Sequence, residues 1–220
     1  MNIKKIPAHN HVKKREGQAF FMKIMFKSMC VGFVLTVIFS FLPFQTVCET
    51  LTQDVLRLHI LANSDTNEDQ ELKLLVRDEI TKECKELFSE AQSLEEAKEI
   101  TLENLEELNK TAATVIKEQG EDYTVSVQLC EEYFNTRYYG SVTMPAGKYT
   151  ALQIKIGKAK GENWWCVLYP SLCVGTSTDY ESFEENLTPQ ECSVVSSGNK
   201  YEFKFKIVEA VTSFFKFLGF

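Results

Sequence analysis

The chain has 220 residues, of which 44% are hydrophobic and 25% charged, and its formal net charge is −7 at pH 7. This length accommodates one domain of ordinary size with accessory segments. The charge is unevenly distributed: residues 1–48 carry seven Lys or Arg and one acid, whereas the remaining residues carry 17 basic and 30 acidic side chains. An acidic body argues against binding to a phosphate backbone, which requires basic patches, so we expect no nucleic-acid partner.

The N-terminal region has the layout of an export signal. Residues 28–44 form a run of seventeen mostly apolar residues without a charge, directly after a basic flank that ends at Lys27. A basic segment followed by an apolar one is typical of a secretory signal, and the run is also near the lower length limit for a membrane-spanning helix. We therefore predict that residues 1–48 are a signal peptide or a membrane anchor. The positive-inside bias predicts a secreted or membrane-anchored protein whose body is extracytoplasmic.

The body begins with an apolar run, residues 55–62, which Arg57 and His59 interrupt. We predict a strand there, followed by a turn at Asn63, Ser64 and Asp65, since these residue types bond local backbone groups. A helix should follow, because apolar residues then recur at steps of three and four. These residues are Leu72, Leu75, Val76, Ile80, Cys84, Leu87 and Phe88.

A second helix is predicted from Ser93, whose pairing with Glu96 is a capping box, to about Gln119, where Gly120 ends it. Its outer face is strongly acidic. That face is either a solvated helix surface or a docking surface for a basic partner.

The remainder of the body shows the alternation of strands. We predict strands at residues 123–129, 138–144, 149–156 and 164–169, separated by segments rich in glycine, proline or polar residues. Together with the opening strand and the helices, they indicate an α+β fold in which two helices cover a small, mostly antiparallel sheet. This domain would span residues 49–173. Residues 174–199 read as a polar loop or linker, and residues 200–220 as an aromatic amphipathic helix that docks on the core or lies in a membrane interface.

Two stretches resemble a known family. The first signature, Arg57 to Asp78, begins R-L-H-I-L-A-N-S-D, and the second comprises Tyr139-Gly140, Pro145 to Leu152 and Asn163 to Cys173. Both resemble stage II sporulation protein R of endospore-forming bacteria. Gln153 and Ser171 depart from the family pattern, which commonly has arginine and a second proline at these positions.

The resemblance implies a secreted signalling protein of endospore formation that has no enzymatic activity of its own. Such a protein crosses into the space between forespore and mother cell. There it activates a membrane-embedded aspartic protease, of the stage II sporulation protein GA type, which processes the sigma-E precursor.

Export would allow cysteines to oxidise. Cys166 and Cys173 flank a segment in which Pro170 can turn the chain back, so we predict a disulfide between them; two buried thiols are the alternative. No C-x-x-C pair occurs, and the histidines provide no spaced ligand set, so we expect no metal and no cofactor.

Calcium binding and catalysis find little support in the sequence. Asp65, Asn67 and Asp69 open like a calcium loop, but Gln70 and Val76 occupy the positions that require glycine and glutamate. His59 is the only histidine of the body and could meet Cys166 or Cys173 in a Cys-His site. No sequence context marks either cysteine as an activated nucleophile, so a packed or hydrogen-bonded His59 is favoured. A secreted hydrolase with an unrecognised Cys or Ser site is therefore the alternative to a protein that is not an enzyme.

Recognition of a partner is the favoured use of the polar signature residues. Adjacent tryptophans in a strand face opposite sides, so one would fill the core and the other could anchor a partner. An internal network joining strand to helix is the competing explanation for the polar residues. The partner-binding candidates are Arg57, His59, Asn63, Ser64, Asp65, Asp69, Gln70, Arg77, Asp78, Gly147, Tyr149, Trp164 and Trp165.

Overall fold

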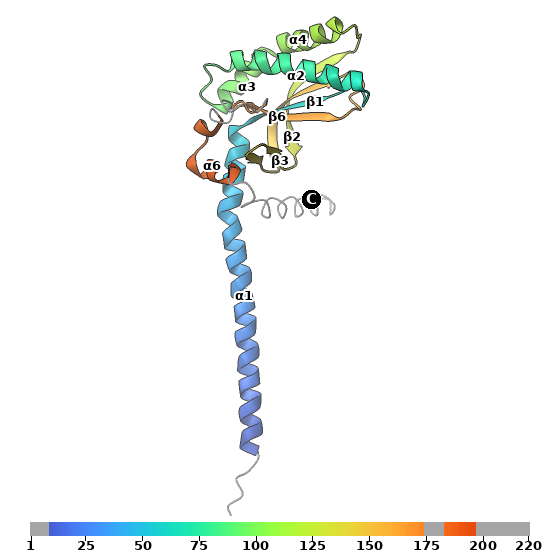
Figure 1. Ribbon diagram of the computed structural model, residues 1–220. Helices are drawn as coiled ribbons and strands as arrows, with labels where there is room; N and C mark the ends of the chain where they lie inside the picture. Colours follow the sequence, from blue (N-terminus) through green and yellow to red (C-terminus); the bar gives the residue numbers. More distant parts are fainter. Residues whose placement is uncertain (1–8, 174–182, 197–220) are drawn as a thin grey trace, which may run out of the picture. The chain divides into compact units, whose positions relative to one another are not determined.

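The structure is a computed structural model that describes residues 9–173 and 183–196 (Figure 1). The chain divides into two compact units, residues 1–45 and residues 46–220. The helix predicted at residues 200–220 lies outside the described residues.

The first unit contains most of α1, His9–Asp54, and this helix includes the apolar run of residues 28–44. Large apolar side chains such as Phe21, Met29 and Phe33 are exposed on it. Within the described residues, no helix combines the length and the apolar character needed to cross a bilayer. The signal peptide or anchor at residues 1–48 stays a prediction.

The second unit is built on a four-stranded sheet with the strand order β2-β5-β1-β6. These strands are β1 (Leu56–Leu61), β2 (Val125–Phe134), β5 (Gly147–Ile156) and β6 (Asn163–Tyr169). β1 runs parallel to β5 and antiparallel to β6, and β2 runs antiparallel to β5. The predicted α+β class and the mostly antiparallel sheet are confirmed, and the opening strand lies in the interior of the sheet.

One predicted strand is wrong. Residues 138–144 do not join the main sheet; they form a separate hairpin of β3 (Arg137–Tyr139) and β4 (Val142–Met144). Gly140 lies in the turn of this hairpin with a φ of 56°, a left-handed conformation that glycine adopts without the steric cost of a Cβ. The chain therefore reverses in the middle of the predicted strand.

Three helices lie over one face of the sheet (Figure 1). They are α2 (Asn67–Leu87), α3 (Leu94–Glu103) and α4 (Leu105–Glu118). Thr66 caps α2 and Ser93 caps α3, each through its side chain. The predicted capping box is only half formed, because the Glu96 carboxylate accepts from the backbone N–H of Gln92. The predicted second helix is interrupted at Asn104, whose side-chain nitrogen donates to the carbonyl oxygen of Ile100 and ends α3.

The alternation of β1 determines the two sides of the sheet. Leu56, Leu58 and Ile60 are fully buried against the helices. Arg57 and His59 point to the opposite face, where a second apolar cluster unites the last turn of α1, β4 and α6 (Pro189–Val195). Both faces of the sheet therefore bury side chains.

The segment predicted as a polar loop or linker, residues 174–199, contains α6 and is not merely a linker. Thr188 and Glu191 form a capping box at its start, and Pro189 occupies the first turn. Val194 and Val195 are buried. A segment with few apolar residues can form a short helix when its N-terminus is capped and its apolar side packs on the core.

The turn between β5 and β6 requires glycine at Gly157. Its φ is 56°, and a Cβ added there would overlap the side chain of Asn63. Gly120 has a similar φ of 81°, but a Cβ added there would meet nothing within 4 Å. A side chain at position 120 would therefore meet backbone strain alone, whereas one at position 157 would meet backbone strain and a clash with Asn63.

We predict that Gly157→Ala destabilises the protein much more than Gly120→Ala. Both changes should cost about 1–2 kcal/mol for the left-handed backbone. Gly157→Ala should cost about 1–3 kcal/mol more, because Asn63 must move. Urea unfolding of both variants measures the difference, and equal losses would contradict the role of Asn63 as the obstructing side chain.

Candidate functional site

The turn after β1 is a hydrogen-bonded clamp on the turn between β5 and β6. Asn63 Oδ1 accepts from the backbone N–H of Lys158 at 2.9 Å, and Asp65 Oδ1 accepts from that of Glu162 at 2.5 Å. Two backbone bonds, from Lys160 to the Asn63 carbonyl and from Gly161 to the Ala62 carbonyl, reinforce the contact. The first signature therefore fixes the turn that leads into β6, where the last part of the second signature begins.

Asp69 ties the clamp to the first turn of α2. Its Oδ2 accepts from Asn63 Nδ2 at 2.8 Å and from the hydroxyl of Ser64, and Gln70 Nε2 donates to the Ser64 carbonyl at 2.9 Å. Asp69 is 5% exposed. Burial by itself would raise the pKa of Asp69, but the hydrogen bonds from Ser64, Asn63 and other donors outweigh burial, so its pKa is lowered. Asp69 is thus an internal group that a partner cannot reach directly.

We predict that Asp69→Asn lowers the free energy of unfolding by about 1.5–3 kcal/mol, because buried hydrogen bonds to a charged acceptor are lost. A lowered pKa means that the stabilisation is complete above the ordinary aspartate value of about 3.9 and disappears as pH falls through the native value. The gap between wild type and variant should therefore narrow below about pH 4. Urea titrations from pH 7 to pH 3 test this, with the exposed Asp122→Asn as control; a gap independent of pH would contradict the assignment.

A half-buried strip runs along α2 beside the edge strand β6. Arg77 stacks on the ring of Trp164, with its guanidinium carbon 4.3 Å from the ring centroid, and pairs with Asp78 at 2.6 Å. One turn earlier, Lys73 Nζ donates to Gln70 Oε1 at 2.5 Å and to the Glu162 carbonyl at 3.1 Å. Burial lowers the pKa of Lys73. We name Asp65, Gln70, Arg77, Asp78 and Trp164 the α2–β6 strip.

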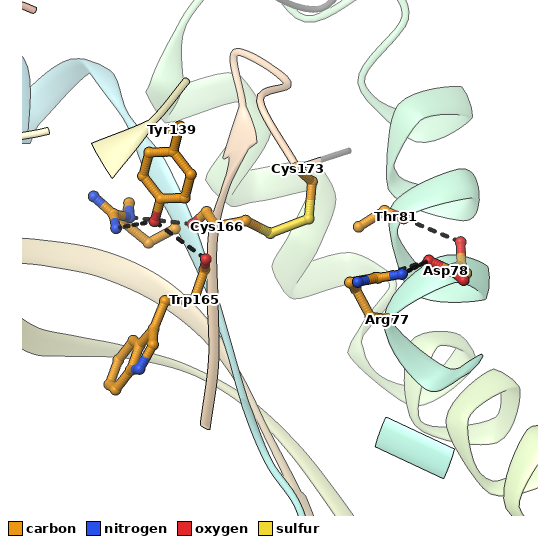
Figure 2. Close-up of a disulfide and its surroundings, with 8 residues drawn as sticks. Arg77, Asp78, Thr81, Tyr139, Trp165, Cys166 and Cys173 are labelled. Atoms are coloured by element: carbon orange, nitrogen blue, oxygen red, sulfur yellow. Dashed lines mark hydrogen bonds and ion pairs between the residues drawn. A yellow bond between two sulfur atoms is a disulfide. The ribbon is translucent and has the colours of Figure 1, made fainter. Parts of the chain in front are cut away.

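Arg57 lies on the opposite face and is fully buried. Its Nε donates to the Cys166 carbonyl at 3.1 Å and its Nη2 to the Tyr139 hydroxyl at 2.8 Å. The Tyr139 hydroxyl in turn donates to the Trp165 carbonyl at 3.1 Å, as Figure 2 shows. Burial lowers the pKa of Arg57.

Aromatic rings surround the Arg57 guanidinium. Its carbon lies 4.4 Å from the Phe134 ring centroid, 5.0 Å from that of Tyr149 and 5.6 Å from that of Tyr139. Such cation–π contacts compensate in part for the loss of water.

His59, also on this face, is 3% exposed and stacks on Trp165, with ring centroids 3.6 Å apart. Its Nδ1 lies 2.8 Å from Glu132 Oε2, to which Gln153 Nε2 also donates at 3.2 Å. Neither Glu132 nor Gln153 was a sequence candidate. Their placement opposite β1 depends on the register of three strands, which the sequence does not reveal.

Two further candidates are packing residues. Tyr149 is 1% exposed and donates to the Pro145 carbonyl at 2.7 Å. A Cβ added at Gly147 would lie 2.9 Å from a methyl carbon of Thr52 in the last part of α1. Both positions therefore hold β5 against α1 and are not available for direct binding.

Cys166 and Cys173 are joined by a disulfide, drawn in yellow in Figure 2. Cys166 lies on the helix-covered face of β6, whereas His59 points to the other face. His59 is therefore packed and hydrogen-bonded, as the sequence favours, and the Cys-His alternative is wrong. Cys84 is buried in the core, and burial raises its pKa to about 12, which makes it a poor nucleophile.

We predict that the disulfide forms in the exported protein. Mass spectrometry without reductant should give a linked peptide two hydrogens lighter than its reduced form. A double change of Cys166 and Cys173 to Ala should lower the free energy of unfolding by about 2–3 kcal/mol, the range for a short closed loop. Free alkylation of both thiols in unreduced protein would contradict the prediction.

Comparison with known proteins assigns the family. The sequence model of stage II sporulation protein R matches residues 52–179, which is more than half of the chain. The chain belongs to the stage II sporulation protein R family. Its role therefore lies in sporulation.

One curated relative is Stage II sporulation protein R of Bacillus subtilis (strain 168), which is 36% identical over 135 residues. The match covers 61% of this chain and 60% of that protein, so the chain spans less than two thirds of the relative's length. No solved structure matches the chain.

The matched region coincides with the sheet, the helices and the clamp. The structure joins the first signature to the turn that precedes Asn163 at the clamp, and to Trp164 of the second signature at the α2–β6 strip. It separates Arg57, His59 and Trp165 onto the opposite face. The thirteen candidates thus form two groups. Strand alternation predicts that Trp164 and Trp165 face opposite sides, but it does not show which of the other candidates each tryptophan joins.

Proposed function

We propose that this protein is an extracytoplasmic signal of endospore formation that activates a membrane-embedded aspartic protease, which then processes the sigma-E precursor. The proposal extends the sporulation role of the family to a partner of the stage II sporulation protein GA type. The protein would act by binding and would carry out no chemistry itself. The match over residues 52–179, the folded domain itself, is the observation that carries the proposal.

The α2–β6 strip is the surface that we propose for this contact. Asp65 and Asp78 are exposed, and Gln70, Arg77 and Trp164 are half-buried. The clamp fixes the start of α2 against β6, and a rigid scaffold presents binding groups at low entropic cost. A half-buried tryptophan stacked with an arginine is typical of the residues that dominate interfaces.

A reconstituted assay tests the proposed function. Residues 46–220 would be added to the extracytoplasmic side of vesicles that contain the partner protease, with the sigma-E precursor supplied on the other side. We expect cleavage of the precursor only when both proteins are present. Cleavage by residues 46–220 without the protease would favour the hydrolase alternative, and no cleavage with both would refute activation.

Within this assay we predict that Trp164→Ala reduces activation at least about tenfold, because hot-spot truncation typically costs 2 kcal/mol or more. The control is Glu107→Ala on the exposed side of α4, which should leave activation unchanged. Thermal unfolding of each variant separates loss of contact from loss of fold. Full activation by folded Trp164→Ala protein would remove the strip from the interface and leave the acidic face of α4 as the next surface.

A further inference from the structure

The sheet face opposite the helices holds two arginines that have no acidic partner among the residues that the structure describes. Arg57 is fully buried, and Arg137 of β3 is half-buried. Nη1 of Arg57 and Nε of Arg137 are buried and form no hydrogen bond. Buried guanidinium groups are normally paired, because an uncompensated buried charge is costly.

Arg77, on the other side of the sheet, is a stacked arginine that does have an acidic partner. Arg77 and Arg137 each stack on one of the two adjacent tryptophans, at 4.3 Å from Trp164 and 5.3 Å from Trp165. Arg77 is neutralised by Asp78 at 2.6 Å. The positive charge of Arg137 repels that of Arg57 and contributes to the lowered pKa of Arg57. Arg137 thus lacks an acidic partner among the described residues, whereas Arg77 has Asp78.

Two further side chains, one two residues from Arg57 and the other next to Arg137 in the chain, also have a buried polar atom without a partner. The hydroxyl of Thr136 and Nε2 of His59 are buried without a hydrogen bond. The Thr136 hydroxyl can donate a hydrogen bond, as the two guanidinium nitrogens can. His59 Nδ1 faces the Glu132 carboxylate and carries the proton of the neutral ring, so Nε2 is an acceptor in that state. The unpaired guanidinium nitrogens of Arg57 and Arg137 belong to side chains that lie against aromatic rings, so the component they lack is an acceptor, and cationic donors favour an anionic one.

The Tyr139 hydroxyl is a neutral acceptor that already bonds one nitrogen of the Arg57 guanidinium. It accepts from Arg57 Nη2 at 2.8 Å. Tyr139 belongs to the hairpin of β3 and β4, which pairs only with itself, and each strand has three residues. β4 is buried in the second apolar cluster and anchors the hairpin, whereas β3 is only partly buried. Displacing the phenol therefore disturbs β3 and the two hydrogen bonds of the Tyr139 hydroxyl but leaves β4 in place.

We propose that Arg57 and Arg137 form a binding site for a carboxylate, supplied by an acidic side chain or the C-terminus of a bound peptide, which displaces the Tyr139 hydroxyl. The planar donor fork of arginine matches a carboxylate in two-point geometry. A single negative charge is also less costly to transfer into this aromatic surrounding than a phosphate dianion. The site is independent of the proposed protease activation and lies on the face opposite the α2–β6 strip.

The first experiment compares 3-phenylpropionate with its uncharged amide as ligands of the full chain. Trp164→Phe protein leaves Trp165 as the reporting tryptophan. We expect the carboxylate to change Trp165 fluorescence and to shift the Arg57 and Arg137 Nε–H signals in NMR spectra, with at least about tenfold weaker binding of the amide. Equal binding of both compounds, or no shift of either arginine, would overturn the proposal.

Three variants assign the binding. Arg137→Gln should weaken carboxylate binding at least about tenfold, whereas Arg77→Gln, which removes the other stacked arginine, should not. Tyr139→Phe should lower thermal stability without ligand yet tighten carboxylate binding, because Arg57 Nη2 is then released. A purely packing role for Tyr139 predicts lower stability with unchanged or weaker binding, and that result would overturn the displacement.

A final comparison distinguishes the sources of the carboxylate. A blocked peptide with one Glu, its Gln counterpart, and the Gln peptide with a free C-terminus would be titrated in parallel. Binding of the first alone assigns an acidic side chain, and binding of the third alone assigns a peptide C-terminus. Equal binding of the Glu and Gln peptides with blocked ends would contradict charge recognition altogether.

Discussion

The side chain of Asn63 joins three elements of the fold. Its oxygen accepts from the backbone of Lys158, and its nitrogen donates to Asp69 at the start of α2. The space beside it is available only because residue 157 is glycine. One amide therefore fixes the end of β1, the position of α2 and the path of the chain into β6, and the α2–β6 strip depends on all three.

The internal network that competes with partner binding as the explanation of the polar first signature accounts for only some of its residues. Asp69 is buried and Asn63 is half-buried, and the two side chains bond each other and a neighbouring turn. Asp65 and Asp78 remain exposed. A polar turn followed by a helix cannot show which of its side chains face inward, because that depends on the segment that packs against it. Here the segment lies almost one hundred residues later in the chain.

Local patterns predicted the elements well and their partners less well. The alternation of β1 and the apolar stripe of α2 were readable, because each follows from the period of one element. The break at Asn104 and the hairpin turn at Gly140 were missed, since a continuous apolar pattern conceals a change of direction. Glu132 and Gln153 next to His59 were missed because strand register is a long-range property.

The two faces of β1 carry different kinds of side chain, apolar toward the helices and cationic or polar toward the opposite side. Leu58 and Ile60 contribute to a core that any apolar residues of suitable volume could build. Arg57 is a cation placed among three aromatic rings without an acidic partner among the described residues, and stability alone does not favour this choice. A buried arginine that only supported the fold would be replaced at little cost by an apolar side chain. Its charge is accounted for if an anion is present during part of the protein's working cycle, when the donors left unpaired in the isolated chain acquire their acceptor.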